Sequence, residues 1–304
     1  MPPHAFSLRQ LQYAVAVAAE LSFRKAAERC HVSQPSLSAQ IAQLEQALGV
    51  KLFERDRRRV LPTVAGQELL ERARRLLVEV DDLAQAASRL GDPLAGTLRI
   101  GVIPTISPYL LPSATPALRA RFPRLRLAWL EDKTGTLVRR LDEGTLDAAL
   151  VALEADLGDL EHEVIARDPF VVVTAPGHAL GRGRGRLRAA DLRAASVLLL
   201  DDGHCFRAQA LSFCASARAH ELEFRATSLS TLAQMVAAGA GVTLLPGLAI
   251  ATEAARAGLV VRRLVEPSPH RTIALVWRKR SPLAPALREV AAALRSVYPG
   301  PRAP

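Results

Sequence analysis

The chain has 304 residues, 49% of them hydrophobic, which is enough for about two globular domains with buried cores. Three cysteines are too few for a disulfide framework, no uncharged run has the length of a membrane span, and the first eight residues lack a signal pattern, so we expect a cytoplasmic protein. The net charge is +10, and residues 1–66 carry nine basic against five acidic side chains, which favours a polyanionic partner.

The first elements along the chain are two short helices. Leu8, Leu11, Val15 and Ala18 recur at helical spacing, which predicts a helix over residues 8–19. Ser22 is a typical N-cap for a second helix over residues 23–30. We expect Cys30, at the end of that helix, to be part of the core.

A third helix follows after a short turn. Ser33 is its predicted N-cap, Pro35 suits its first turn, and Gly49 ends it. This spacing is typical of a helix-turn-helix. The exposed face of the third helix carries amides and hydroxyls that can read base edges in the major groove, namely Gln34, Ser36, Ser38 and Gln40.

The segment 51–62 is predicted to be a hairpin wing with arginines at its tip. A charge run of this kind is usually a solvated loop. Directly after a helix-turn-helix, however, arginines at a wing tip suit a narrow minor groove.

Several motifs of this domain resemble the LysR-type transcriptional regulators, among them Ala26-Ala27, Val32 to Ser38, Leu44-Glu45, Leu52 to Arg55 and Thr63 to Gly66. The resemblance implies a winged helix-turn-helix domain over residues 1–62, in which Gln34, Pro35 and Ser38 contact the operator and Arg58 enters the minor groove. We therefore expect these DNA-contacting residues: Ser33, Gln34, Pro35, Ser36, Ser38, Gln40, Arg55 and Arg58.

Thr63 is the predicted N-cap of a long helix over residues 63–90. Apolar residues alternate at spacings of four and three, as in a two-stranded coiled coil: Leu69, Ala73, Leu76, Val80, Leu83, Ala87 and Leu90. At about 1.5 Å per residue this apolar stripe is too long to be covered by residues 1–62 of the same chain, which we call the reader. We therefore expect the stripe to pack against a second chain and form a dimer.

Residues 91–96 are a predicted hinge, and the remainder alternates strands with helices, which indicates an α/β domain with parallel sheets. Strands are expected near residues 98–103, 125–130, 148–153, 170–174, 197–200, 242–245 and 272–277, and helices over 108–121, 134–143 and 229–238. Residues 182–188, in which arginines alternate with two glycines, are predicted to be a flexible loop.

Two of the three cysteines lie between residues 201 and 214. Cys205 follows an apolar run and a glycine, as at a strand-to-helix junction, and His204 and Arg207 favour its thiolate, although Asp201 and Asp202 oppose it. Residues 208–217 contain no glycine or proline and are predicted to be helical. The Cα of Cys214 should then lie about 13 Å from that of Cys205, beyond the roughly 7 Å that a disulfide tolerates. Both cysteines are therefore either small buried apolar residues or parts of a switch that rebuilds the segment.

Residues 97–304, which we call the sensor half, resemble the two-lobed, periplasmic-binding-protein-like sensors of LysR-type regulators. The similarity is strongest to the hydrogen-peroxide-sensing branch of that family. The matching motifs are Ile103-Pro104-Thr105, Asp202 to Cys205 with Cys214, Phe224 to Leu229, and Thr243 to Pro246. The resemblance implies Rossmann-like lobes over residues 97–166 with 270–304 and over 167–269. It also implies a peroxidatic Cys205, a resolving Cys214 and a peroxide pocket formed by Thr105, Thr134, His204, Arg207 and Arg271. Ala208 replaces an acidic residue of enterobacterial members.

These features predict a peroxide-sensing activator, with no cofactor and no metal, that forms a homotetramer on promoter DNA. Its further expected partners are RNA polymerase and a thiol reductant of the glutaredoxin or thioredoxin type. Two other functions stay open: a LysR-type regulator that responds to a small organic inducer in the cleft, and a thiol peroxidase with a DNA-binding appendage.

Overall fold

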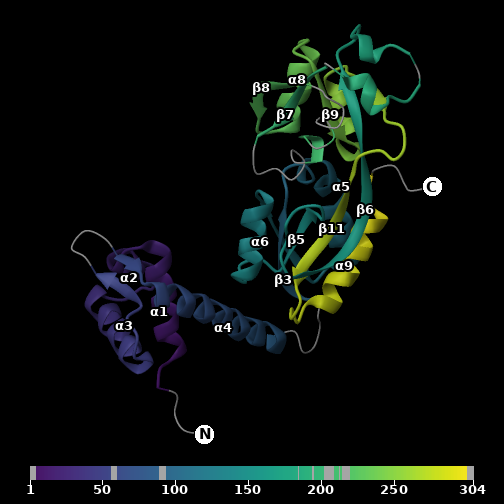
Figure 1. Ribbon diagram of the computed structural model, residues 1–304. Helices are drawn as coiled ribbons and strands as arrows, with labels where there is room; N and C mark the ends of the chain where they lie inside the picture. The colour runs from purple at the N-terminus through teal and green to yellow at the C-terminus, as the bar shows by residue number, and fades with distance from the viewer. Residues whose placement is uncertain are drawn as a thin grey trace. The chain divides into compact units, whose positions relative to one another are not determined.

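The computed structural model describes residues 5–55, 60–88, 94–183, 185–193, 195–201, 209–211, 213 and 220–299. Within it the chain forms two compact units, Met1–Ser88 and Arg89–Pro304. The first unit consists of helices and a short hairpin, whereas the second is built on a large sheet flanked by helices (Figure 1). No described helix is long and apolar enough to span a membrane.

The first unit contains α1 (Leu8–Glu20), α2 (Phe23–Arg29), α3 (Gln34–Leu48), the antiparallel hairpin of β1 (Phe53–Arg55) and β2 (Val60–Pro62), and α4 (Val64–Ser88). The predicted caps are confirmed: the hydroxyls of Ser22 and Ser33 accept from backbone N–H groups three residues on, and Gly49 ends α3 at φ 69°. Leu37, Ile41 and Leu44 are fully buried, which fixes the inner face of α3.

Glu45 connects α3 to the start of the wing. Its side chain is buried, and its Oε1 accepts hydrogen bonds from the backbone N–H of Leu52 at 2.9 Å and of Phe53 at 3.3 Å. The hydroxyl of Thr63 donates to the Lys51 carbonyl at 2.7 Å and accepts from Gly66 N–H at 2.8 Å. Both ends of the hairpin are thus held by side-chain hydrogen bonds, so the wing has a defined position beside α3.

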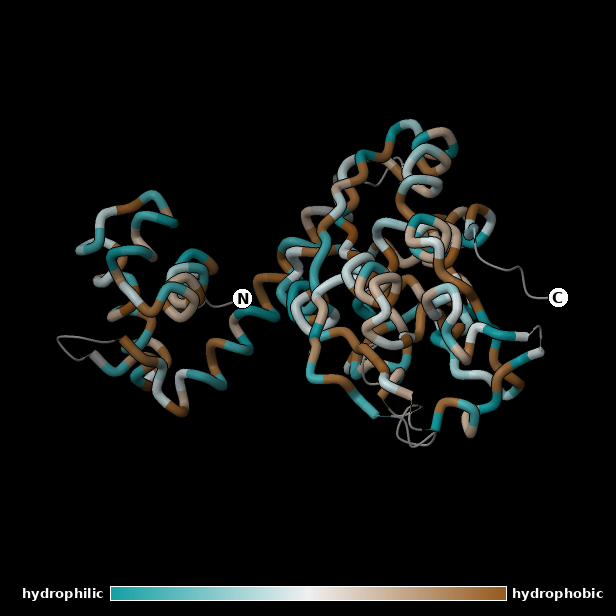
Figure 2. Tube along the Cα trace, turned by 90° about the horizontal axis from the view of Figure 1, so that it is seen from above, coloured by the Kyte–Doolittle hydropathy of each residue, from teal (hydrophilic) through white to brown (hydrophobic). Residues whose placement is uncertain are grey.

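The apolar seam of α4 divides into two parts. Leu69 and Ala73 pack on the core of their own unit, which corrects the prediction that the whole stripe is available to a partner. From Leu76 onward the seam is exposed, with exposed fractions of 50% at Leu76, 37% at Val80 and 71% at Leu83. Hydrophobic and hydrophilic residues alternate along this helix (Figure 2).

In the second unit the described strands form one nine-stranded sheet in the order β4-β3-β5-β11-β6-β9-β7-β8, with β10 beside β6. The strands are β3 (Gly96–Val102), β4 (Leu125–Glu131), β5 (Ala148–Ala152), β6 (Leu160–Thr174), β7 (Ser196–Leu200), β8 (His220–Ala226), β9 (Val242–Pro246), β10 (Val260–Arg263) and β11 (His270–Arg278). All seven predicted strands are present.

The prediction of parallel sheets is confirmed for part of the sheet only. β3 runs parallel to β4 and β5, and β7 runs parallel to β8 and β9, but β11 is antiparallel to both β5 and β6. β6 pairs with β11 through Pro169 and with β9 from Phe170 onward, so a single strand connects the two halves of the sheet. β9, β10 and β11 all run antiparallel to β6, so this strand takes part in three of the four antiparallel pairs among the described strands of the sheet.

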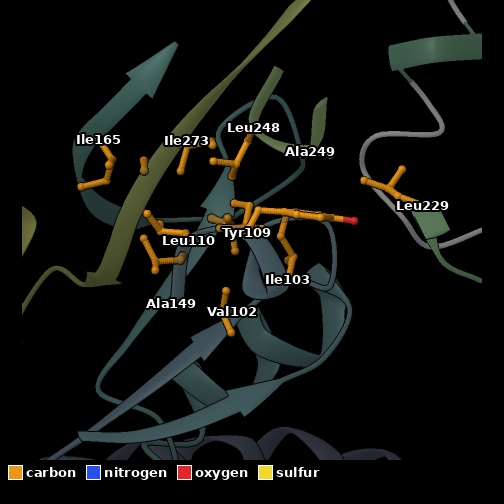
Figure 3. Packing of buried hydrophobic residues seen from close by; sticks show 14 of the residues in the cluster. Val102, Ile103, Tyr109, Leu110, Ala149, Ile165, Leu229, Leu248, Ala249 and Ile273 are labelled. Carbon is orange, nitrogen blue, oxygen red and sulfur yellow. The ribbon is translucent and has the colours of Figure 1, made fainter. Parts of the chain in front are cut away.

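The described helices of this unit include α5 (Ser107–Arg121), α6 (Thr134–Asp142), α8 (Leu229–Ala237) and α9 (Ala284–Ser296), and the first three confirm the predicted helices. Short helical turns are η1 (Ala179–Gly181), η2 (Ala189–Leu192), η3 (Gly247–Ala249) and η4 (Ile250–Ala254). In the core, side chains of β3, α5, η3 and β11 meet, among them Val102, Leu110, Leu248 and Ile273 (Figure 3).

Described residues of the arginine-rich loop and of the turn before it contact a buried arginine and a strand end. Arg262 is 8% exposed, and its guanidinium donates to the carbonyl oxygens of Leu180, Arg182 and Gly185. Leu187 pairs with Leu264 in an isolated bridge. The buried Arg262 therefore holds backbone carbonyl groups of the loop that was predicted to be flexible.

Candidate functional site

The reader presents the predicted polar residues on the outer face of α3. Ser33, Gln34, Pro35 and Ser36 are exposed. Ser38 and Gln40, one and two turns along, are partly exposed. Since the opposite face of α3 is buried, this is the surface that the helix can offer to a DNA groove.

Two of the predicted DNA contacts belong to the wing. Arg55 ends β1, and Arg58 lies outside the described residues. Cys30 is the C-cap of α2 and is only partly buried at the edge of the core, which corrects its placement among buried residues.

In the sensor unit, Thr105 and Thr134 follow neighbouring parallel strands. Thr105 comes after β3 and Thr134 begins α6 after β4, and both side chains are buried. Parallel strands have their carboxyl ends at the same edge of a sheet, which is where ligands bind in α/β folds. The predicted pocket residues Thr105 and Thr134 thus lie along one edge.

Arg271, the third described pocket residue, is fully buried at the start of β11. Its Nη1 donates to the Thr105 hydroxyl at 2.7 Å and its Nη2 to the Thr105 carbonyl at 3.0 Å. Its Nε donates to Asp168 Oδ2 at 2.9 Å, and this ion pair has no exposed surface on either side chain. The structure thus joins Arg271 to Thr105 through two direct hydrogen bonds.

The remaining pocket residues, His204 and Arg207, and both redox cysteines, Cys205 and Cys214, lie outside the described residues. The described chain reaches Asp201, whose carboxylate is 3.9 Å from the ammonium of Lys133, the residue before Thr134. The segment with the cysteines therefore starts beside Thr134. It resumes as helix at residues 209–211 and 213, within the helix that the sequence predicts.

The sequence did not reveal two buried polar groups of the sensor unit, Asp168 and Gln209. Asp168, on β6, was not recognised because its stretch resembles a polar loop. Gln209 has a buried side-chain amide whose Nε2 and Oε1 find no hydrogen-bond partner among the described residues. Buried amides are normally satisfied, so Gln209 is a candidate to bind a polar ligand.

A second buried polar cluster crosses from α5 to η4. Tyr109 extends from α5 with its hydroxyl toward Leu229 (Figure 3), and it donates to Glu253 Oε1 at 2.8 Å. Ser230 donates to the same oxygen at 2.7 Å. Burial, and next the hydrogen bond to Glu253, raise the pKa of Tyr109 well above its ordinary value, so the phenol stays a neutral donor. Among the described residues no cluster could hold a metal ion.

A winged helix-turn-helix followed by an α/β sheet domain with a buried polar site defines a DNA-binding protein of the ligand-sensing class. Residues 8–67 match the family described as bacterial regulatory helix-turn-helix protein, lysR family, and residues 91–299 match the LysR substrate binding domain. The chain belongs to the LysR family of bacterial regulators and, within it, to the OxyR group.

This membership rests on similarity along the whole chain. The chain is 44% identical over 295 residues to the DNA-binding transcriptional dual regulator OxyR of Escherichia coli K12, covering 97% of this chain and 96% of the relative. It resembles the full-length structure of a cysteine-to-aspartate variant of Pseudomonas aeruginosa OxyR, with a TM-score of 0.77, 34% identity and coverage of 99% and 100%. A cysteine-to-serine variant of Corynebacterium glutamicum OxyR, with hydrogen peroxide bound, matches with a TM-score of 0.66, 34% identity and coverage of 96% and 92%.

Proposed function

We propose that this protein is a transcriptional regulator that senses hydrogen peroxide through a reversible disulfide between Cys205 and Cys214 and activates oxidative-stress defence genes. The observation that supports this most directly is the buried Thr105 hydroxyl, held by Arg271 at the sheet edge beside which the cysteine segment starts. A small, buried hydrogen-bonding site suits a ligand as small as peroxide. One relative with this architecture was solved with hydrogen peroxide bound.

The proposed signal is a rearrangement of the segment between the cysteines. The Cys205 thiolate reacts with peroxide to give a sulfenic acid, which Cys214 converts to a disulfide. The described residues of this segment, 209–211 and 213, are helical. A helix running from Cys205 to Cys214 would separate the two Cα atoms by about 13 Å, so the proposed disulfide requires that the segment be rebuilt. Such a strained disulfide is easily reduced, as a reversible signal requires.

The proposed assembly is a cytoplasmic homotetramer, a dimer of dimers, on double-stranded promoter DNA. Residues 63–90 form the dimerisation helix and residues 91–96 the hinge. The sensor lobes comprise residues 97–166 with 270–304 and residues 167–269. The tetramer acts on RNA polymerase, and a thiol reductant of the glutaredoxin or thioredoxin type resets it. The protein is a sensor and not an enzyme.

Two measurements test this function against the alternatives. Thiol titration before and after micromolar peroxide should show the loss of two thiols per chain, and operator footprints should differ between the two redox states. A regulator of a small organic inducer keeps its thiols and its footprint under peroxide. A thiol peroxidase turns over many peroxide molecules with a dedicated reductant, whereas a sensor reacts about once per reduction.

The wing gives a prediction about salt. Each phosphate that an arginine neutralises lowers log affinity by about 0.9 per unit of log salt, so we expect Arg58→Ala to reduce the slope by about that amount. Gel shifts on operator DNA between 50 and 200 mM salt, roughly the range over which such slopes are resolved, measure it. Arg72→Ala is the control, because Arg72 pairs with Glu68 on α4 and is not among the predicted DNA contacts. An unchanged slope for Arg58→Ala places the wing tip away from the duplex.

The switch predicts a local change in amide hydrogen exchange. Exchange in residues 201–220 should differ between the reduced and oxidised protein, because the disulfide requires unwinding of the helix that includes 209–211 and 213. The fully buried strand β5 should exchange equally in both states and serves as the internal control. Identical exchange in residues 201–220 would refute the switch even if the disulfide formed.

A further inference from the structure

Asp168 is a buried carboxylate at the junction of the two halves of the sensor sheet. It lies on β6, two residues before Phe170, where the pairing of the strand changes from β11 to β9, and it has no exposed surface. Its Oδ2 accepts from Arg271 Nε at 2.9 Å and its Oδ1 from the Leu248 backbone N–H at 2.9 Å. A charge buried to this extent persists only when paired, so Asp168 and Arg271 depend on each other.

The pairing fixes the direction of the Arg271 guanidinium. A guanidinium is planar, and its five N–H groups form a rigid fork. With Nε held by Asp168, the two terminal nitrogens point at Thr105, where they reach its hydroxyl at 2.7 Å and its carbonyl at 3.0 Å. Asp168 therefore acts on Thr105 through Arg271.

This arrangement determines how the Thr105 hydroxyl can bond. A hydroxyl has one hydrogen to donate and two lone pairs to accept with, whereas arginine only donates. Arg271 occupies a lone pair of Oγ1, so the hydroxyl hydrogen must point elsewhere. Among the described residues Oγ1 makes no other hydrogen bond. Within the described part of the chain, the buried Thr105 hydroxyl thus keeps its hydrogen available for a ligand oxygen.

We infer that Asp168 is a positioning residue for peroxide reduction: through Arg271 it orients the Thr105 hydroxyl to donate to the departing peroxide oxygen. The inference rests on the proposed function. In the reaction the Cys205 thiolate forms a bond to one peroxide oxygen while the O–O bond breaks. The electron pair of that bond stays on the second oxygen, which leaves as hydroxide and takes a proton from solvent to become water. A donor aimed at the leaving oxygen stabilises the negative charge that develops there.

A double-mutant cycle tests the inference in the full chain. The variants Asp168→Asn, Thr105→Val and their combination are made in a Cys214→Ser background, so that the sulfenic acid accumulates and can be labelled. The readout is the second-order rate constant of Cys205 with hydrogen peroxide. Loss of a positioned donor typically costs on the order of 10²-fold, so we expect each single change to lower the rate constant by about that factor.

The combination distinguishes positioning from a general structural role. If Asp168 acts through Thr105, then Asp168→Asn has little further effect once Thr105 is valine, and the double variant stays within about twofold of Thr105→Val. If Asp168 only stabilises the fold, the two losses multiply, and that result would overturn the inference. A wild-type Cys205 that does not react with peroxide at all would instead overturn the proposed function.

Alkylation by iodoacetamide provides a second readout. Above the pH at which the thiol has fully titrated, alkylation requires the same exposed thiolate but no hydrogen bond to a leaving peroxide oxygen. We expect Asp168→Asn to leave this plateau rate within about twofold while the peroxide rate falls on the order of 10²-fold. Equal losses in both reactions would overturn the inference, because they indicate a disturbed thiol and not a missing donor.

Gly247→Ala keeps the experiment decisive if Asp168→Asn fails to fold. A Cβ at residue 247 would lie 2.9 Å from Asp168 Oδ1 and 3.2 Å from the Pro169 carbonyl oxygen, so the carboxylate must shift while its charge remains. We expect a selective loss of the peroxide rate, again absent in the Thr105→Val background. An unchanged peroxide rate in Gly247→Ala would contradict the inference.

Discussion

Replacing Cys205 with serine should abolish the response to peroxide: we expect the operator footprint of the treated variant to stay that of the reduced protein. The thiolate is the reactive form of cysteine, whereas a serine hydroxyl is neither ionised nor oxidised under these conditions. Footprinting and transcription from a target promoter, with and without micromolar peroxide, measure the effect. Equal peroxide reactivity in wild type and Cys205→Ser would assign the sensing to another group.

The other two cysteines should behave differently from Cys205. Cys214→Ser still forms the sulfenic acid at Cys205, which a dimedone-type reagent labels, but it cannot form the disulfide. Cys30→Ser is the matched control, because the chain has only three cysteines and Cys30 lies in the reader unit, half-buried at the end of α2. Its response should equal that of wild type. A lost response in Cys30→Ser would place a sensing thiol in the reader.

The reader could be predicted from the sequence because its signals are local. Ser22, Ser33 and Gly49 each act on the backbone within one helical turn, so their capping roles follow from sequence position alone. The position of the wing could not be predicted in this way. It depends on Glu45 accepting from residues seven and eight positions further on, and a buried carboxylate in the middle of a helix has no local signature.

The sensor strands were predictable where they are apolar and not where they are polar. β5 and β9 are buried throughout, so their hydrophobic runs predicted them. β8 was missed because, as the edge strand, it alternates charged and apolar residues, and the first part of β6 was missed because it carries charges that are neutralised only in the sheet. Asp168 is the clearest case, since its partner Arg271 is 103 residues further along the chain.

The same limitation applies to the proposed peroxide site. Thr105, Asp168 and Arg271 come from three separate strands or strand ends, and only the sheet order brings them together. The resemblance to LysR-type regulators indicated Thr105 and Arg271 as pocket residues. It did not indicate Asp168, whose importance follows from burial and hydrogen-bond geometry.

A charge in the exposed part of the α4 seam should separate the proposed dimer. Leu83 is 71% exposed in the single chain and continues the spacing of Leu76 and Val80. Burial of a leucine contributes roughly 1.5 to 3 kcal/mol, and a twofold interface contains the residue twice. We therefore expect Leu83→Asp to weaken dimerisation by about 3 to 6 kcal/mol, a rise in dissociation constant on the order of 10² to 10⁴.

Sedimentation equilibrium of the full chain measures this change, and operator affinity should fall with it because a monomer binds only one half-site. Ala84→Asp is the matched control: it adds the same charge to an exposed neighbouring position outside the seam and should leave the dimer intact. The thermal stability of the isolated Leu83→Asp chain should hardly change, since an exposed leucine loses little packing within its own unit. A Leu83→Asp protein that dimerises as tightly as Ala84→Asp would show that the exposed seam of α4 is not the dimer contact.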